Sequence, residues 1–330
     1  MTQDSPGCIV TLTPNPSIDR TLVLGDELRR GAVHRISSSG AQAGGKGVNI
    51  SRACLAAGVA TWAVLPADTD DPFAHELTVS GIPSRLVPGG GPVRVNLTIT
   101  EPDGTTTKLN HAGSVAGEQV LAALAATLHD LADAADWIVL AGSLPPGAPE
   151  AWYAALVDDL RSRTRVAVDT SDAPLLAVVE HLDSAPPHVM KPNGHELASL
   201  TGHDGDALEA DPAAAAAAAR SLVDRGVGAV LATLGSHGAV LVTPDGAWHA
   251  TPAPTEVVST VGAGDSSLFG YLLGDLRALA PARRLALAVA YGSAAAGLPG
   301  TTIPEPAQVR PDLVHVRDLR LGDVTAGVSG

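Results

Sequence analysis

Short apolar runs alternate with helical patterns along most of this chain, and this alternation is the strongest constraint on its fold. Repeated β–α alternation predicts an α/β fold of three layers, in which helices cover both faces of a mainly parallel central sheet. A chain of 330 residues that is 45% hydrophobic can bury such a core within one domain, residues 1–330. The predicted strands occupy residues 9–12, 60–64, 137–141, 166–169, 188–190, 230–233 and 239–242, with helical patterns at 117–131, 149–160 and 212–225.

Two stretches, roughly 21–36 and 93–109, break the alternation because they carry β patterning without intervening helices. Within the second stretch, Asp103-Gly104 is a hairpin turn signal. Strands of this kind do not fit easily into a parallel sheet that is covered by crossover helices. We therefore predict that the two stretches form a small, separate sheet.

A Gly-Ala-Gly-Asp turn, formed by Gly262, Ala263, Gly264 and Asp265, directly precedes an apolar helical pattern. The backbone N–H groups of such a turn and the positive end of the helix dipole point at one spot, which favours an anion. Asp265 in the first helical turn could remove a proton while the amides stabilise negative charge on a phosphoryl group. The alternative is a plain tight turn in which Asp265 caps the helix.

A second glycine cluster occupies residues 40–49 and leads into another helical pattern. Gly44 and Gly45 allow the backbone to approach a ligand closely. Asn49, one turn into the helix, offers a donor and an acceptor for sugar hydroxyl groups. Asp19 is predicted in the loop after the first strand, at the sheet edge where α/β folds bind ligands. The alternative for Asp19 is a solvated turn residue.

Lysine is rare in this chain, because only Lys46, Lys108 and Lys191 are lysines among 21 lysine and arginine residues. Lysines that persist among arginines are expected where a compact ammonium group is needed. Lys46 lies inside the second glycine cluster, and Lys191 follows a predicted strand. These two positions indicate a functional role.

The composition excludes several classes of function. The formal net charge of −14 argues against a nucleic-acid partner and against an anionic membrane surface. Residues 1–7 lack a signal segment and no apolar run could span a bilayer, so we expect a cytoplasmic protein. Cys8 and Cys54 fall in predicted elements, and no disulfide is expected. The 11 histidines lack metal-ligand spacing, and the sequence contains neither a P-loop nor a Gly-x-Ser-x-Gly elbow.

The motifs together resemble those of the ribokinase-like (pfkB-type) carbohydrate kinase family. The cluster ending in Asn49 is similar to the first family signature, residues 260–270 are similar to the second, and Asn193 with Glu196 resembles an Asn-x-x-Glu motif. The resemblance covers the chain from the first strand to about residue 300. It implies a ribokinase-like fold, ATP as phosphate donor, Mg²⁺ as cofactor, and a small β-sheet lid over the sugar site. Such a lid often pairs with a second subunit, so a homodimer through the lid is expected.

The resemblance also implies roles for individual residues. Asp265 would be the general base, with the amides of Gly262, Ala263 and Gly264 stabilising the transferred group. Asn193 and Glu196 are expected to organise magnesium, in part through water. The residues expected to face the nucleotide phosphates are Lys191, Thr233, Gly235 and Ser236. Ser143 is expected to face the substrate, with an ordinary turn residue as the alternative.

Positive charge near the lid favours a sugar that already carries a phosphate group. Lys46, Arg94 and Lys108 are candidates to hold it, with solvated edge-strand charges as the alternative for Arg94 and Lys108. The motif Asn-Pro-x-x-Asp, which ends at Asp19, resembles the family branch that phosphorylates sugar phosphates, and most of all its members acting on fructose 1-phosphate at C6.

Three questions stay open at this point. Tagatose 6-phosphate and fructose 6-phosphate are alternative substrates within the same branch. A regulator that binds nucleotide and sugar phosphate without catalysis is the alternative from a different class. Finally, an acidic, proline-containing loop at 65–71 departs from the family pattern near the expected sugar site.

Overall fold

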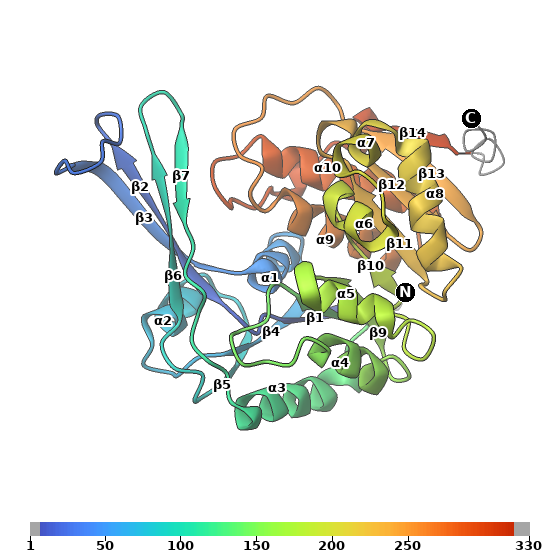
Figure 1. Cartoon of the computed structure of the whole chain (residues 1–330), viewed down its shortest axis with the longest axis horizontal. Helices are drawn as coiled ribbons and strands as arrows, with labels where there is room; N and C mark the ends of the chain where they lie inside the picture. The colour runs from blue at the N-terminus through green and yellow to red at the C-terminus, as the bar shows by residue number, and fades with distance from the viewer. Residues whose placement is uncertain (1–6, 320–330) are drawn as a thin grey trace, which may run out of the picture.

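The computed structural model describes residues 7–319, which form a ten-stranded sheet and a four-stranded sheet (Figure 1). The strand order in the large sheet is β14-β13-β12-β11-β10-β9-β8-β1-β4-β5. Its parallel strands are β1 (Cys8–Leu12), β4 (Ala60–Pro66), β5 (Ser84–Val87), β8 (Trp137–Ala141), β9 (Arg165–Asp169), β10 (Val189–Met190) and β11 (Ala229–Thr233). Its antiparallel strands at one edge are β12 (Ala239–Thr243), β13 (Gly246–Thr251) and β14 (His315–Asp318). The mainly parallel sheet predicted from the alternation is confirmed.

Helices cover both faces of the large sheet, because its strands carry apolar side chains on both sides. Successive residues of a strand point to opposite faces, so Val10 and Leu12 join one core and Ile9 joins the other. The first core is completed by α3 (Glu118–Leu131), α4 (Trp152–Leu160), α5 (Asp172–Glu180), α6 (Gly194–Thr201), α7 (Gly205–Ala210) and α8 (Pro212–Val223). The second core is completed by α1 (Lys46–Ala56), α9 (Ala263–Leu276) and α10 (Pro281–Ala296).

The four-stranded sheet, which we call the lid, projects away from the body of the molecule (Figure 1). Its strands, in spatial order, are β3 (Ile36–Gly44), β2 (Ser17–Leu24), β6 (Arg94–Thr100) and β7 (Thr106–Leu109). A separate sheet was predicted and is confirmed, as is the turn between β6 and β7, where Gly104 has a φ of 90°. Helix α2 (Pro72–Val79) packs near the base of the lid, where Phe73 and Leu77 share a small core with Ile18.

The predicted lid boundaries, 21–36 and 93–109, are wrong for the first pair of strands. Strand β2 begins earlier, at Ser17, and β3 runs on to Gly44, so half of the expected glycine loop is a strand. The segment 36–44 is rich in serine, glycine and alanine, which have little β propensity of their own. It becomes a strand because it pairs with β2 from Ser17 opposite Gly44 to Leu24 opposite Ile36.

The two faces of the lid differ in chemistry because side chains alternate along each strand. On one face, Asp19 lies opposite Asn96 and Gln42, and Lys108 lies opposite Thr98. The other face carries apolar side chains, which include Leu22, Val95, Leu97, Ile99 and Leu109. Of these, Val95 is 36% exposed and Leu109 is 54% exposed. The lid therefore presents an apolar face that the described residues of this chain leave partly uncovered.

The helical pattern predicted at 212–225 is confirmed as a helix. The alanine-rich segment forms α8, whose first turn is capped by the Asp211 carboxylate accepting from the amides of Ala213 and Ala214. Cys8 and Cys54 are both free. Among residues 7–319, no helix combines the length and the apolar composition that a membrane crossing requires.

Candidate active site

The Gly-Ala-Gly-Asp turn opens α9 as predicted. Gly262 adopts a left-handed conformation with a φ of 80°, and Asp265 follows in the first turn, where it is only 6% exposed. The amide of Ala263 donates to the carbonyl of Thr260 at 3.3 Å, so it is partly engaged within the turn. No side chain caps α9, and the alternative interpretation of Asp265 as a helix cap is therefore wrong.

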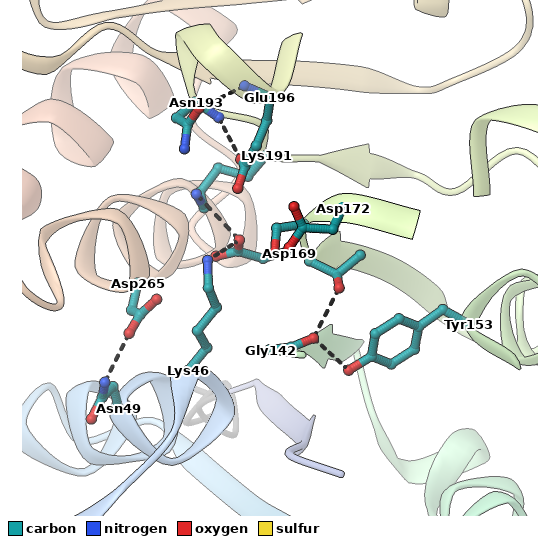
Figure 2. Close-up of polar contacts among 12 residues, drawn as sticks. Lys46, Asn49, Gly142, Tyr153, Asp169, Asp172, Lys191, Asn193, Glu196 and Asp265 are labelled. Atoms are coloured by element: carbon teal, nitrogen blue, oxygen red, sulfur yellow. Dashed lines mark hydrogen bonds and ion pairs between the residues drawn. The ribbon is translucent and has the colours of Figure 1, made fainter. Parts of the chain in front are cut away.

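Asp265 instead faces α1. The Asn49 side-chain amide donates to Asp265 Oδ2 at 2.8 Å, and Asn49 is itself 4% exposed (Figure 2). Burial raises the pKa of the Asp265 carboxyl above its ordinary value, although the ammonium group of Lys46 opposes this shift. A buried carboxylate with a raised pKa, held at a helix N-terminus, has the properties of a general base.

Lys46 and Lys191 meet at one carboxylate, that of Asp169. The Nζ atom of Lys46 lies 2.6 Å from Asp169 Oδ1, and the Nζ atom of Lys191 lies 3.3 Å from the same oxygen (Figure 2). Asp169 is the last residue of β9 and is fully buried. Because Lys46 begins α1 and Lys191 follows β10, this contact joins the glycine cluster to the strand end that was predicted to face the nucleotide phosphates.

The charges in this group shift one another's pKa values. Burial alone would raise the pKa of Asp169, but Lys191 and Lys46 outweigh it and lower the pKa. Burial alone would lower the pKa of Lys46, but the charges of Asp169 and Asp265 outweigh it and raise the pKa. Lys46 and Asp169 are therefore charged at neutral pH, while Asp265 is the carboxylate that is easier to protonate.

Asp169 was missed in the sequence analysis. A signal for it exists, because an acidic residue at the end of a predicted parallel strand lies at the ligand-binding edge of the sheet. What the sequence does not contain is the pairing, since Lys46 and Asp169 are 123 residues apart along the chain.

Asn193 and Glu196 form a capping box at the start of α6 (Figure 2). The amide of Glu196 donates to Asn193 Oδ1, and the amide of Asn193 donates to Glu196 Oε2, each at 2.8 Å. Asn193 also forms a parallel β-bridge with Thr233, at the end of β11. Gly235 and Ser236 follow in a 3-10 turn (Gly235–His237) and are exposed. The predicted nucleotide-side residues therefore lie along two adjacent strand ends.

Asp19 lies in strand β2 of the lid, so its predicted placement in the loop after the first strand is wrong. Pairing with β3 and β6 extends β2 to Ser17, which draws Asp19 into the sheet. Its Oδ1 atom accepts from the Ser17 hydroxyl at 2.7 Å and from the Asn96 side-chain amide at 3.2 Å. A side chain at Gly44 would overlap the Asp19 carboxylate, because an ideal Cβ there would lie 2.1 Å from Oδ2. Gly45, with a φ of 116°, completes the turn into α1.

Arg94 and Ser143 meet at the base of the lid, through Asn15. The Arg94 guanidinium donates to the carbonyls of His111 and Asn15 at 2.9 and 3.0 Å, so two of its nitrogens are engaged by backbone. Its Nε atom is buried and has no hydrogen-bond partner among the described residues. The Asn15 side-chain amide donates to the Ser143 hydroxyl at 3.3 Å. Asn15 and Arg94 line a small pocket whose wall also includes Pro66 and Ser114.

The unusual loop at 65–71 is structured by its own acidic residues. Asp71 Oδ1 caps α2 by accepting from the Phe73 amide, and its Oδ2 accepts from the amide of Val93. Asp68 accepts from the amide of Gly89 at 2.9 Å. The carboxylates of Asp68 and Asp71 therefore hold the segment that leads into β6.

Lys108 is not brought to the other predicted site residues. It is exposed in the edge strand β7, where its cross-strand neighbour is Thr98. No ion pair of Lys108 is found among the described residues.

The whole chain was compared with known proteins. A family model described as pfkB family carbohydrate kinase matches residues 13–308. The chain is 39% identical over 287 residues to the 1-phosphofructokinase of Xanthomonas campestris pv. campestris, covering 84% of this chain and 88% of that protein. It is 36% identical over 314 residues to the 1-phosphofructokinase of Haloferax volcanii, covering 93% and 97%. The crystal structure of phosphofructokinase-2 from Escherichia coli in complex with substrates and products aligns with a TM-score of 0.83 at 26% identity, covering 92% of this chain and 97% of that one.

Proposed function

This chain belongs to the pfkB family of carbohydrate kinases, and on that premise we propose that it phosphorylates fructose 1-phosphate at the C6 hydroxyl. The class of reaction follows from the family: a phosphotransferase with an alcohol group as acceptor and ATP as donor. The choice of sugar phosphate is supported by relatives named 1-phosphofructokinase at 36–39% identity. The observation that carries the proposal is the position of Asp265, buried at the N-terminus of α9 and bonded to Asn49.

In the proposed reaction, Asp265 takes the proton of the C6 hydroxyl as the oxygen attacks the γ-phosphorus of ATP. The bond between the γ-phosphorus and the bridging oxygen breaks, so the products are ADP and fructose 1,6-bisphosphate. The amides of Gly262 and Gly264 stabilise the transferred group at the positive end of the helix dipole, and the amide of Ala263 contributes less because Thr260 engages it. Asn49 orients the Asp265 carboxylate toward the hydroxyl group.

The nucleotide side is assigned to Lys191, Asn193, Glu196, Thr233 and the turn at Gly235 and Ser236. Family membership implies magnesium with the nucleotide, and we propose that Asn193 and Glu196 organise it. The capping box engages one Glu196 oxygen and leaves Oε1 outside it, and residues 7–319 contain no cluster of three metal-ligating acidic, histidine or cysteine side chains. Such a sparse donor set fits a magnesium ion held mainly by phosphates and water. Bound there, magnesium would shield the phosphate charges.

The sugar-phosphate side is assigned to Asp19, Gly44, Gly45, Asn49, Lys46, Arg94 and Ser143. Asp19 is an acceptor for sugar hydroxyls, held by Ser17 and Asn96, and Gly44 leaves room for it. Arg94 remains the candidate for the phosphate already on the sugar, through its unpartnered Nε atom. Lys108 is assigned to the same phosphate only if the lid moves over the site, because it is exposed on an edge strand.

We also propose a homodimer through the lid. The apolar face of Leu22, Leu97 and Leu109 is continuous across three strands, β2, β6 and β7, and a lone four-stranded sheet exposes such a face to water. A second copy of the chain offers an identical face, so two lids could cover each other in a symmetric dimer.

The sequence analysis left two alternatives open, and no specific observation favours either. Tagatose 6-phosphate or fructose 6-phosphate would use the same base, with the hydroxyl at C1 as acceptor. A regulator without catalysis would not need a buried carboxyl group with a raised pKa at the anion site. Asp265 is such a group, which argues against the regulator.

Phosphorus NMR of a reaction with MgATP and fructose 1-phosphate tests the proposal. We expect the γ-phosphate signal to disappear while a second phosphomonoester signal, coupled to the C6 protons, appears at the same rate. Loss of the γ-phosphate to free inorganic phosphate alone would contradict the proposal, because it would mean hydrolysis rather than transfer.

A further inference from the structure

The surroundings of Asp169 are more buried and more tightly packed than a purely structural aspartate requires. Asp169 ends β9 and is fully buried, and its backbone is held on the β8 side, where its carbonyl accepts from the Gly142 amide at 2.9 Å. Next to it, the Thr170 hydroxyl and the Tyr153 hydroxyl both donate to the carbonyl of Gly142, at 2.9 and 3.0 Å (Figure 2). This packing holds the Asp169 carboxylate in one place.

The carboxylate uses only one of its two oxygens. Oδ1 contacts both ammonium groups, whereas Oδ2 is buried and has no hydrogen-bond partner among the described residues. A buried charge is costly unless it is paired and its remaining lone pairs are satisfied. Neutral side chains in place of all three charged residues would be cheaper for the fold, so the retained charges indicate a function that requires these two lysines together.

The two lysines reach Asp169 from different parts of the site. The side chain of Lys46 is 34% exposed, whereas that of Lys191 is 4% exposed. Lys191 Nζ lies beside the start of α9, only 3.3 Å from where a Cβ on Gly264 would be. The Lys191 ammonium group therefore lies next to the amides that would face the transferred group, and the Lys46 ammonium group contacts the same Asp169 oxygen. If the Asp169 carboxylate were absent, the two ammonium groups would repel each other.

We propose that Asp169 is a positioning residue for phosphoryl transfer, whose carboxylate holds Lys46 and Lys191 together around the transferred group. The inference rests on the proposed kinase function and extends it to a residue outside the recognised motifs. Asp169 itself does not touch the reacting atoms in this account. It acts through the two ammonium groups, which neutralise negative charge on the phosphoryl group during its transfer.

The first test compares Asp169→Asn with Asp172→Asn, a matched control three residues along the chain. Asp172 is exposed, and its side chain accepts a hydrogen bond from the Ser171 hydroxyl and makes no other among residues 7–319. Asparagine also tolerates its φ of 57°. We expect kcat to fall roughly 10-fold or more in Asp169→Asn. The Kd for ATP should not rise, because a negative charge is lost beside a polyanion. Asp172→Asn should keep both values within about twofold of wild type.

The pH profile separates positioning from a structural role. Asp265 is faced by the charges of Lys46, Lys191 and Asp169, and by the amide of Asn49. Loss of the Asp169 charge should move the acidic limb of kcat/KM to lower pH, because that charge favours protonation of Asp265. A protein that is merely less stable would lose melting temperature without moving this limb.

Three results would overturn the proposal. One is a kcat in Asp169→Asn within about threefold of wild type. Another is recovery of wild-type kcat at high magnesium, which would make Asp169 a metal ligand. The third is an ATP Kd that rises in parallel with the loss of kcat. Wild-type turnover on fructose 1-phosphate, fructose 6-phosphate and tagatose 6-phosphate is measured first. A failure of the proposed kinase function is then seen separately from a failure of the proposed role of Asp169.

A second experiment decides the matter if Asp169→Asn does not fold, since its loss leaves Lys191 buried and unpaired. Lys46→Met, Lys191→Met and the double variant are compared in kcat. Residues that act as one unit through a shared carboxylate should give a double variant only slightly slower than the slower single variant. Losses that multiply would overturn the proposal.

Discussion

Asp265 and Asp169 are two buried carboxyl groups of one site, and their pKa values are shifted in opposite directions. Burial raises the pKa of Asp265, whereas Lys191 and Lys46 overcome burial and lower the pKa of Asp169. Separation of this kind assigns different roles to neighbouring carboxylates, one taking a proton and one remaining charged. We therefore assign proton transfer to Asp265 and the positioning of charge to Asp169.

Asp265→Asn should abolish most of the turnover while the protein remains folded. Loss of a general base costs about 10²- to 10⁴-fold in rate, and we expect kcat to fall by about 10³-fold. The KM values for both substrates should change by less than about threefold, since the carboxylate acts mainly in the transition state. An ADP-release assay measures both, with circular dichroism as the control for folding. Turnover within about tenfold of wild type would contradict the role of the base.

The stability of Asp265→Asn should depend on pH with a defined sign. A raised pKa means that the folded state disfavours the charged carboxyl, so Asp265 destabilises the protein above its folded pKa and does not below the unfolded value, near roughly 3.9. We expect Asp265→Asn to melt about 2 °C or more above wild type at pH 8. The difference should shrink as the pH is lowered toward 4. Scanning calorimetry across this range checks it, and a lower melting temperature at pH 8 would contradict the pKa assignment.

Strand β3 brings the glycine cluster and the sugar acceptor together. Gly44 lies where a side chain would overlap the Asp19 carboxylate, whereas a Cβ on Gly40, in the same strand, would meet nothing within 4 Å. Local sequence alone does not separate these two glycines. Pairing with β2 does, because it places Ser17 opposite Gly44 and draws Asp19 against it.

Gly44→Ala should therefore damage sugar-phosphate binding, with Gly40→Ala as its matched control. We expect the KM for the sugar phosphate to rise roughly 10-fold or more in Gly44→Ala, because Asp19 must move. The KM for ATP should stay within about twofold of wild type in both variants. Steady-state kinetics with each substrate varied in turn provides the measurement. Equal effects of the two substitutions would contradict the assigned role of Asp19.

The apolar face of the lid carries a prediction about assembly. Leu109→Asp places a charge on that face, opposite Leu97, while Thr106→Asp places one on the other face of the same strand. A charge buried in an apolar interface is strongly disfavoured, so Leu109→Asp should weaken the dimer roughly 100-fold in Kd. Light scattering over a concentration series compares the two variants with wild type. A wild-type monomer at micromolar concentration would rule out the lid dimer.

For the whole molecule, the sequence predicted what depends on local periodicity. The β–α alternation and the helix opening at Gly262 are local patterns, and both were found where expected. The charge pairing of Asp169 was missed, because it depends on contacts across more than a hundred residues. Arg94 was predicted to hold phosphate with its fork, and backbone carbonyls engage two of its nitrogens, which only the folded loops determine.

The edges of both sheets were the least predictable part of the fold. Strand β14 (His315–Asp318) follows a segment without a strong pattern and exists because it pairs with β13. Strand β3 likewise depends on its partner β2 rather than on its own serine- and glycine-rich sequence. In both cases backbone pairing decides the structure, and side-chain pattern reports little of it.

The overall charge bears on the substrate. A net charge of −14 repels sugar phosphates and ATP, so local cations must capture them against the field of the whole protein. Lys46 and Lys191 both contact the Asp169 carboxylate, and Arg94 lies at the base of the lid. A sugar without a phosphate group would leave the cation assigned to the sugar phosphate without an anionic partner.

The most direct test is kcat/KM with MgATP, measured in parallel on fructose 1-phosphate, fructose 6-phosphate, tagatose 6-phosphate and unphosphorylated fructose. We predict that kcat/KM is highest on fructose 1-phosphate, at least about 10-fold above its value on each of the other sugars. A preference for either 6-phosphate would contradict the choice of substrate and move the accepting hydroxyl to C1. No turnover on any sugar, with nucleotide binding intact, would contradict the kinase function itself and favour the regulator.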